Sequence, residues 1–435
     1  MPEFTTPQII SIVVFIVVFA LIISEKVHRT VAALAGAVVL ILTGILSFDT
    51  GMEHIDFGTL GVLVGMMIFV AVVKQSGIFE YIAIRTAKVA KGNPWIIMVL
   101  FCLITAVLSA FLDNVTTVLL IGPVTFTVCK MLEMSPVPFF ITEIMASNIG
   151  GTATLIGDPP NIMIGSAANL TFMDFLEFNG PAIIMIMVVA IAIFYVMYGR
   201  NMGASAEQQA SIMELHAYEA IKNKSLFNKS VAMIVIVAIA FVCHSMVNIP
   251  PSVVALTAAA IMLLISQADV EKILLDVEWA TIGFFAGLFI VVGGLAETGV
   301  INMLANGLID VTGGNMLITI IVLVWASAII SSFLDNIPMV ATLIPILLAM
   351  ESTGVDVLPY WWAISLGACI GGIGTLIGAS ANVVGSLRLP HQLHGLHQGR
   401  LPADAGVHRH QLRVPGNSFL RVLSFRRSTE RRKRA

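Results

Sequence analysis

The chain is a succession of long apolar segments, and this feature limits its fold more than any other. Most of these segments are about 15 to 20 residues long, enough for an α-helix to cross the roughly 30 Å hydrocarbon layer of a bilayer. Of the 435 residues, 58% are hydrophobic and only 11% are charged, whereas soluble domains carry about 25% charged residues. The sequence therefore predicts an all-α polytopic membrane protein.

Charge and cysteine usage exclude several other classes. The formal net charge is −3 and the basic residues form no stripe, so we expect no nucleic-acid partner. The four cysteines, Cys102, Cys129, Cys243 and Cys369, lie in apolar surroundings without paired spacing, which indicates neither a disulfide framework nor a zinc site. The start, MPEFTTPQ, has no basic region, so the first apolar segment is predicted to be a retained span. We expect an integral protein of the lipid bilayer, in the plasma (inner) membrane if the source is bacterial, without a bound cofactor.

The apolar windows predict spans near 8–24, 30–46, 57–74, 137–165, 180–198, 230–247, 252–266, 279–296 and 360–385. Two longer stretches, 95–128 and 316–350, are interrupted by the polar sequences SAFLDN and SSFLDN, and we interpret each as a helical hairpin that enters the membrane and returns. With the first loop cytoplasmic, this threading places every Lys and Arg before residue 388 on the cytoplasmic side, as short loops prefer. The agreement supports both the spans and the hairpins.

The chain also contains an internal repeat at an offset of 222 residues. IDFGTLG at 55–61 aligns with VEWATIG at 277–283, and SAFLDN aligns with SSFLDN. One residue shorter, at an offset of 221, TLIG at 154–157 returns at 375–378 and Asn161 aligns with Asn382. The segment 78–94 carries three basic residues, and its counterpart, 300–316, carries none. The charge rule therefore places the two on opposite faces. We predict two inverted-topology repeats, each with a re-entrant hairpin and a broken transmembrane helix, as is typical of secondary transporters.

The repeat also sets the predicted domain boundaries. We assign 1–199 to the first repeat, 200–229 to a cytoplasmic linker, 230–385 to a second repeat without its last helix, and 386–435 to a basic tail. Shifted by one nucleotide, the codons of 392–397 permit Ser-Phe-Met-Asp-Phe, which resembles the sequence at 172–175 of the first repeat. We therefore predict that the tail is a frameshift product; a genuine cytoplasmic tail is the alternative.

Polar residues gather at the two hairpin tips, where an ionised Asp costs about 2.5 to 3.5 kcal/mol if it lies at the bilayer centre. The candidate binding residues at the tips are Asp113, Asn114, Thr116, Thr117, Asp335 and Asn336. One interpretation is that Asp and Asn only cap the returning helix of each hairpin. The other is that the Asn side chain, exposed carbonyls and helix ends also bind a cation or substrate. The two roles are compatible.

Glycines and prolines predict the helix breaks at 150–161 and 371–382. The candidate binding residues there are Thr152, Thr154, Asp158, Asn161, Thr375 and Asn382. Asp158 aligns with Ala379, so the symmetry of the fold does not require a carboxylate. We predict that Asp158 carries the coupling ion, H⁺ or Na⁺; the alternative is that it only caps the helix that begins at Pro159. Glu143, in the same span, is a further candidate acid.

Two long motifs carry a family resemblance: FLDNVTTVLLIGPV at 111–124 and NIGGTATLIGDPPNIMIG at 148–165. The chain from about 8 to 385 resembles the ion transporter superfamily, with its citrate transporter-like domain. Within it, the resemblance is to the branch of arsenite efflux pumps, the melanosomal P protein and NhaD-type sodium/proton antiporters. The resemblance implies a homodimer with a fixed scaffold and a transport domain that moves as an elevator. It also implies that the hairpin tips and unwound helices form the site.

The tips depart from those of the related sodium/dicarboxylate carriers, which bear Ser-Asn-Thr. Asn114 and Asn336 match the Asn, but Asp113 and Asp335 replace the Ser. Carboxylates there disfavour a dicarboxylate, so we expect a secondary transporter of the arsenite and sodium–proton antiporter branch with a small ion as its substrate. A sodium-coupled dicarboxylate or citrate symporter is the alternative, and a passive ion channel is a more remote one. We expect no enzyme, because the sequence contains neither HExxH nor GxSxG. It also lacks a P-loop, so any ATPase would be a separate subunit.

Overall fold

The computed structural model of the protein describes residues 4–24, 26–375 and 382. Within these residues the chain forms α-helices, short 3-10 helices and no strand. Seven of the helices are long and apolar enough to cross a membrane. The predicted all-α polytopic membrane class is confirmed.

The part of the chain assigned to the first repeat contains α1 (Thr6–Ser24), α2 (Arg29–Leu42), α3 (Phe48–Glu53), α4 (Phe57–Lys74), α5 (Ile78–Val89), α6 (Pro94–Ser109), α7 (Asn114–Met131), α8 (Val137–Gly151), α9 (Pro159–Ala168) and α10 (Phe172–Met197). A helix α11 (Ala206–Glu214) follows, between the short 3-10 helices Gly199–Asn201 and Ala217–Ala220. The remainder contains α12 (Lys224–Cys243), the 3-10 helix His244–Val247, α13 (Pro251–Ser266), α14 (Val270–Asp276), α15 (Trp279–Glu297), α16 (Val300–Thr312), α17 (Met316–Phe333), α18 (Asn336–Ser352) and α19 (Leu358–Gly371).

The internal repeat extends from the sequence to the helices. Each helix from α2 to α7 begins 222 residues before its counterpart, from α13 to α18. Gly77 and Gly299, which precede α5 and α16, both adopt the left-handed conformation, with φ of 79° and 77°. Glycine is favoured at both places because it has no Cβ to clash at positive φ. The opposite orientation of the two copies across a membrane stays a prediction.

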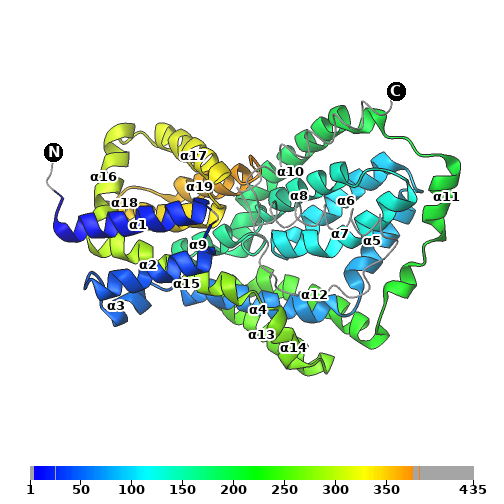
Figure 1. The fold of residues 1–435 in the computed structure, drawn as a ribbon, viewed down its shortest axis with the longest axis horizontal. Coiled ribbons are helices and arrows are strands. Elements are labelled where there is room, and N and C mark those ends of the chain that lie inside the picture. Colours follow the sequence, from blue (N-terminus) through cyan, green and yellow to red (C-terminus); the bar gives the residue numbers. More distant parts are fainter. Residues whose placement is uncertain (1–3, 25, 376–381, 383–435) are drawn as a thin grey trace. The chain divides into compact units, whose positions relative to one another are not determined.

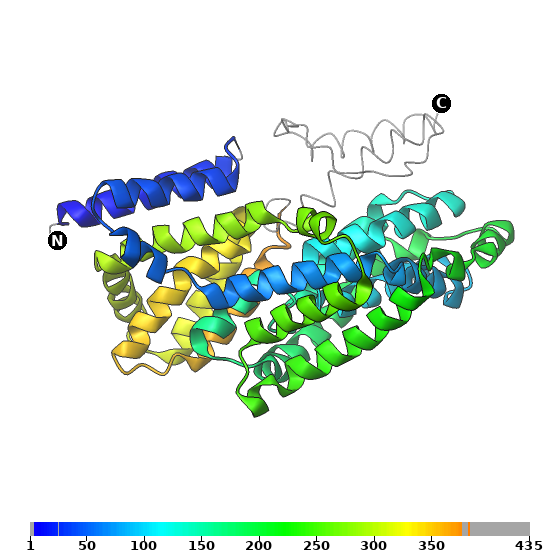
Figure 2. The same cartoon turned by 90° about the horizontal axis from the view of Figure 1, so that it is seen from below.

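The two copies pack against each other through two equivalent pairs of helices. The helix α4 packs against α13, and α15 packs against α2; Figure 2 shows α4 beside α12 and α13. A Cβ on Gly65 would lie 2.5 Å from the carbonyl carbon of Ala255, and one on Gly287 would lie 2.7 Å from that of Ala33. Side chains larger than hydrogen would therefore separate both helix pairs. We call α2, α4, α13 and α15 the framework.

Each predicted hairpin is present as two helices joined by a short break, and the helix that follows packs on its first arm. Figure 1 shows α6, α7 and α8 as neighbours and α17, α18 and α19 as a second group. A Cβ on Gly150 would clash with the carbonyl oxygen of Ala106, and one on Gly371 would lie 2.5 Å from that of Ala328. We call these two groups the hairpin bundles.

Several helix boundaries differ from those expected. The predicted span 137–165 is interrupted between α8 and α9, as the glycines and prolines indicated. The helix α10 begins eight residues before the expected 180, because Thr171 and Asp174 form a capping box. The helix α12 begins at Lys224 rather than at 230, since the Asn223 side chain accepts a hydrogen bond from the Leu226 N–H. The predictions on the tail 386–435 and on Ala379 lie outside the described residues.

Candidate functional site

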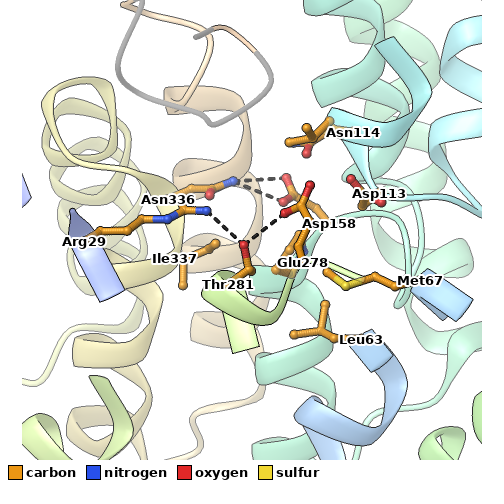
Figure 3. Close-up of a pocket in the computed structure, with 12 residues that line it drawn as sticks. Arg29, Leu63, Met67, Asp113, Asn114, Asp158, Glu278, Thr281, Asn336 and Ile337 are labelled. Atoms are coloured by element: carbon orange, nitrogen blue, oxygen red, sulfur yellow. Dashed lines mark hydrogen bonds between the residues drawn. The ribbon is translucent and has the colours of Figure 1, made fainter. Parts of the chain in front are cut away.

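A cavity of about 30 Å³ lies where both hairpin tips, the break before α9, and the starts of α2 and α15 converge. Figure 3 shows its polar side chains, which come from both repeats. The charged and amide residues that line it are Arg29, Asp113, Asn114, Asp158, Glu278 and Asn336. A polar cavity of this size has room for a water molecule or a small cation.

The first tip uses its polar residues largely for local structure. The Asp113 carboxylate accepts a hydrogen bond from the Thr116 N–H at 2.8 Å, and the Thr117 hydroxyl donates to the Asp113 carbonyl at 3.0 Å. The Asn114 amide donates to the side-chain oxygen of Asn148 on α8, at 3.0 Å. The predicted capping role is therefore confirmed for Asp113, which also lines the cavity.

The second tip has the same fold but different chemistry. Asp335 stands at the start of α18 and makes no capping hydrogen bond. Its carboxylate forms an ion pair with the Arg29 guanidinium, with 2.7 Å between Nη1 and Oδ2. Arg29 also donates to the Thr281 hydroxyl at 3.2 Å, and that hydroxyl donates to Glu278 at 3.0 Å. The capping interpretation is wrong for Asp335, because Arg29 binds the carboxylate instead.

Asp158 is the most deeply buried acid of the cavity, with 1% of its surface exposed. It precedes Pro159 and Pro160, which have no N–H groups to be capped, and its side chain makes no capping hydrogen bond. Both carboxylate oxygens instead accept from the Asn336 amide, at 3.2 and 3.1 Å. Capping alone is therefore wrong for Asp158. Its carboxylate joins the helix break of the first repeat to the hairpin tip of the second.

The remaining predicted binding residues hold the helix breaks in shape. The Asn161 amide donates to the carbonyls of Thr152 and Thr154, at 3.1 and 2.9 Å. The Asn382 amide donates in the same way to Thr375, at 2.8 Å. These side chains compensate for the carbonyls that lose their helical partners at each break.

Hydroxyl groups tie each break to its hairpin. The Thr154 hydroxyl donates to the Ala110 carbonyl, and the Thr375 hydroxyl donates to the Ser332 carbonyl. The Thr152 hydroxyl instead donates within its own turn, to the Asn148 carbonyl at 2.7 Å. None of these three threonines lines the cavity. They position the breaks rather than face the space between the acids.

Each break also contacts, through a side chain, the helix that precedes the other break. The Asn148 amide donates to the side-chain oxygen of Asn382 at 3.2 Å. The Cys369 thiol donates to the side-chain oxygen of Asn161 at 3.7 Å. Because Cys369 aligns with Asn148, and Asn382 with Asn161, the two contacts are equivalent under the repeat. Both repeats therefore contribute to one site.

Glu143 lies apart from this site. It is buried between α8 and α7, where its carboxylate accepts a hydrogen bond from the Thr125 hydroxyl at 2.6 Å. It does not line the cavity. The structure therefore places this candidate acid in a protein-facing position away from the cavity.

Sequence reasoning missed Arg29, Thr281 and Glu278. They lie at the starts of predicted spans, where polar residues are ordinary, and they reach the tip only through tertiary packing. One signal could have singled out Arg29: its counterpart in the second repeat is Pro251. Because the second copy builds the same helix start without a charge, the shared fold does not require the arginine.

The arrangement is suited to binding a proton or one small cation. Asp158 is repelled electrostatically by Asp335 and Asp113, and Asp113 is repelled by Glu278. Such repulsion is relieved when a cation or a proton is taken up. Among the described residues, no three His, Cys, Asp or Glu side chains converge closely enough to hold a metal ion. A cation here would therefore share carboxylate, amide and carbonyl oxygens.

The apolar helices, the helix breaks and the charged cavity among them define an integral multi-pass membrane transporter. Residues 19–367 match the protein-family model described as citrate transporter, and the chain belongs to this family.

Curated relatives agree with this assignment. The chain is 44% identical over 384 residues to an uncharacterized transporter of Mycobacterium bovis, which covers 87% of this chain and 89% of the relative. It is also 44% identical over 386 residues to a 46 kDa membrane protein of Mycobacterium leprae, covering 87% and 90%. To the human P protein it is 34% identical over 452 residues, covering 84% of this chain and 54% of the P protein. The predicted resemblance to the superfamily that includes the P protein is confirmed.

Proposed function

We propose that this chain is a cation-coupled secondary transporter of the elevator type, in the arsenite and sodium–proton antiporter branch of the superfamily. The observation that carries the proposal is the charge around the cavity. Asp113, Asp158 and Glu278 line it and Asp335 lies beside it, whereas Arg29 is the one basic residue among its described lining residues. This excess of acid favours H⁺ or Na⁺ and opposes a polycarboxylate.

In the proposed mechanism Asp158 carries the coupling ion. The Asn336 amide holds the carboxylate in place, and both groups lie on the side of the hairpin bundles. A buried carboxylate without a counter-ion is costly in an apolar environment. Neutralisation of Asp158 by a proton or Na⁺ lowers this cost and allows the hairpin bundles to move past the framework. The substrate, either neutral arsenite or a cation, would cross with that movement, and we expect the transporter to act as a homodimer.

A second candidate is a citrate or dicarboxylate symporter. The description of the matching family as citrate transporter favours it, and Arg29 could pair with a substrate carboxylate. In this structure, however, Arg29 is bound to Asp335, and a polycarboxylate would enter a cavity flanked by further acids. We therefore rank this candidate second.

Proteoliposomes containing the full chain test the proposal. Uptake of arsenite, ²²Na⁺ and citrate is measured with and without an imposed pH gradient. We expect accumulation of arsenite or Na⁺ above the external concentration, driven by the gradient, and no accumulation of citrate. Gradient-driven citrate uptake would favour the symporter. Uptake that stops once the internal and external substrate concentrations are equal would indicate passive transport, as through a channel.

A further inference from the structure

We propose that Arg29 is a tethered cation that competes with the coupling ion for Asp335 and thereby sets the cation affinity of the site. The inference rests on the proposed function and names a group that regulates the same site. It assigns a role to a residue that the sequence motifs do not include.

The guanidinium is held on several sides. Nη1 lies 2.7 Å from the Asp335 carboxylate, Nη2 lies 3.2 Å from the Thr281 hydroxyl, and the Phe284 ring lies beneath it with its centroid 5.1 Å away. Figure 3 shows the side chain reaching from α2 toward Thr281. A planar cation with fixed donors suits this setting better than a flexible ammonium group would.

The repeat shows that the fold does not need this arginine. Pro251 occupies the equivalent position at the start of α13, and α13 still packs on α4 as α2 packs on α15. At the first tip Asp113 caps its own helix. Arg29 is therefore an addition to one copy, placed where it neutralises one particular acid.

The position of the pair links cation binding to movement. Arg29 belongs to the framework, whereas Asp335 belongs to a hairpin tip. Asp335, with 12% of its side chain exposed, lies beside the cavity whose lining includes the buried Asp158, and the two carboxylates repel each other. A coupling cation in the cavity is therefore attracted by Asp335 as well as by Asp158. If it replaces Arg29 at Asp335, the contact between the framework and the tip is lost, and the bundle is released.

Competition between Arg29 and the coupling ion predicts the direction in which cation affinity changes when Arg29 is replaced. Replacing the guanidinium removes the competing cation from Asp335, so Arg29→Gln should bind cations more tightly than the unchanged protein. Removal of any positive charge near these acids raises cation affinity to some degree, so direct competition is identified by an effect that disappears when Asp335 is absent. The charged groups facing Arg29 and its partner are Asp113, Asp158, Glu278 and Asp335, so the effect should depend on Asp335 in particular.

The test measures ²²Na⁺ binding and proton uptake by the purified full chain in detergent. We expect Arg29→Gln to lower the half-saturating cation concentration about five- to tenfold, the range of a partly buried charge pair. Arg29→Lys keeps the charge but not the two donors of the guanidinium, so it should shift the half-saturating concentration in the same direction by a smaller factor than Arg29→Gln. Asp335→Asn and the double variant with Arg29→Gln should bind alike, since the acid for which the arginine competes is then absent. Tighter cation binding by the double variant than by Asp335→Asn would contradict direct competition.

Thr281→Val is a second variant that leaves Arg29 in place and removes one of its anchors. It should shift the half-saturating concentration in the same direction, by a smaller factor. Unchanged or weaker cation binding in monodisperse Arg29→Gln or Thr281→Val protein would overturn the inference. Absence of any cation binding by the parent protein would instead contradict the proposed function.

Discussion

At the scale of single residues, the decisive contact is that between Asp158 and Asn336. The sequence singles out both residues, because each is a polar group within a predicted apolar region. It does not predict that they meet, since they are 178 positions apart and belong to different repeats. The sequence also does not indicate that Arg29 belongs to the site, because arginines are common near the ends of membrane spans.

We predict that Asp158→Asn loses gradient-driven transport to background. Asn is nearly isosteric and can still accept from Asn336, but it cannot carry a proton or a full negative charge. Asp269→Asn is the matched control, because Asp269 is exposed and lies at the start of α14. The hydrogen bond from Lys272 lowers the pKa of Asp269, so the control also removes an ionised carboxylate. Retained coupled transport by Asp158→Asn would remove this residue from the mechanism.

Glu143→Gln should behave differently. Glu143 is buried against Thr125 and does not line the cavity, and Gln preserves an acceptor for the Thr125 hydroxyl. We expect a transport rate within about twofold of the parent and an unfolding temperature no lower. Comparison of uptake and thermal unfolding in the same preparations checks both expectations. A loss of coupling in well-folded Glu143→Gln would show that Glu143 is a second acid required for coupled transport.

At the scale of elements, the hairpins and breaks could be predicted, whereas the ends of several helices could not. Interruptions such as SAFLDN and GGTATLIGDPPN are local signals, because prolines, glycines and buried acids act on their own turns. The start of α10 was missed because the apolar window begins late, while its capping box lies among polar residues. The pairing of α4 with α13 depends on contacts between distant segments, which periodicity alone does not reveal.

We predict that Gly150→Ala and Gly371→Ala each destabilise the protein by about 1 to 3 kcal/mol, the usual cost of overpacking. In each case the added methyl would meet the backbone of the neighbouring hairpin arm, which cannot rotate away. Gly307→Ala is the control, because its Cβ would meet nothing within 4 Å in α16. It should be neutral or stabilising, by up to about 1 kcal/mol. Unfolding in detergent measures all three, and equal stabilities would contradict the close packing of α8 on α6.

At the scale of the whole molecule, two copies of one helical unit contribute residues to one site. The sequence predicts the repeat, and the helices α2 to α7 and α13 to α18 follow it at a constant offset. Two of the differences between the copies bear directly on the charge of the site. Arg29 in place of Pro251 and Asp158 in place of Ala379 give a symmetric framework an asymmetric site.

We further propose that residues 386–435 result from a change of reading frame. The match to the citrate transporter family ends at 367, before this segment, and its basic composition differs from that of every preceding span. Resequencing the gene should show an inserted or deleted nucleotide near codon 385. A frame-restored chain should then show a higher rate of gradient-driven uptake than the present chain. An intact frame across codons 380–390 would remove this proposal.

The most direct measurement of the central claim is the labelling of introduced cysteines from each side of the membrane. Arg85→Cys and Gly307→Cys place exposed thiols on the equivalent helices α5 and α16. Cys243 is replaced by Ser because it is partly exposed and could react with the reagent, whereas the other three native cysteines are buried. Two copies inverted in the membrane predict that a membrane-impermeant thiol reagent labels the two positions from opposite faces. Labelling of both from the same face would contradict the inverted arrangement, and with it the site that the two repeats are proposed to share.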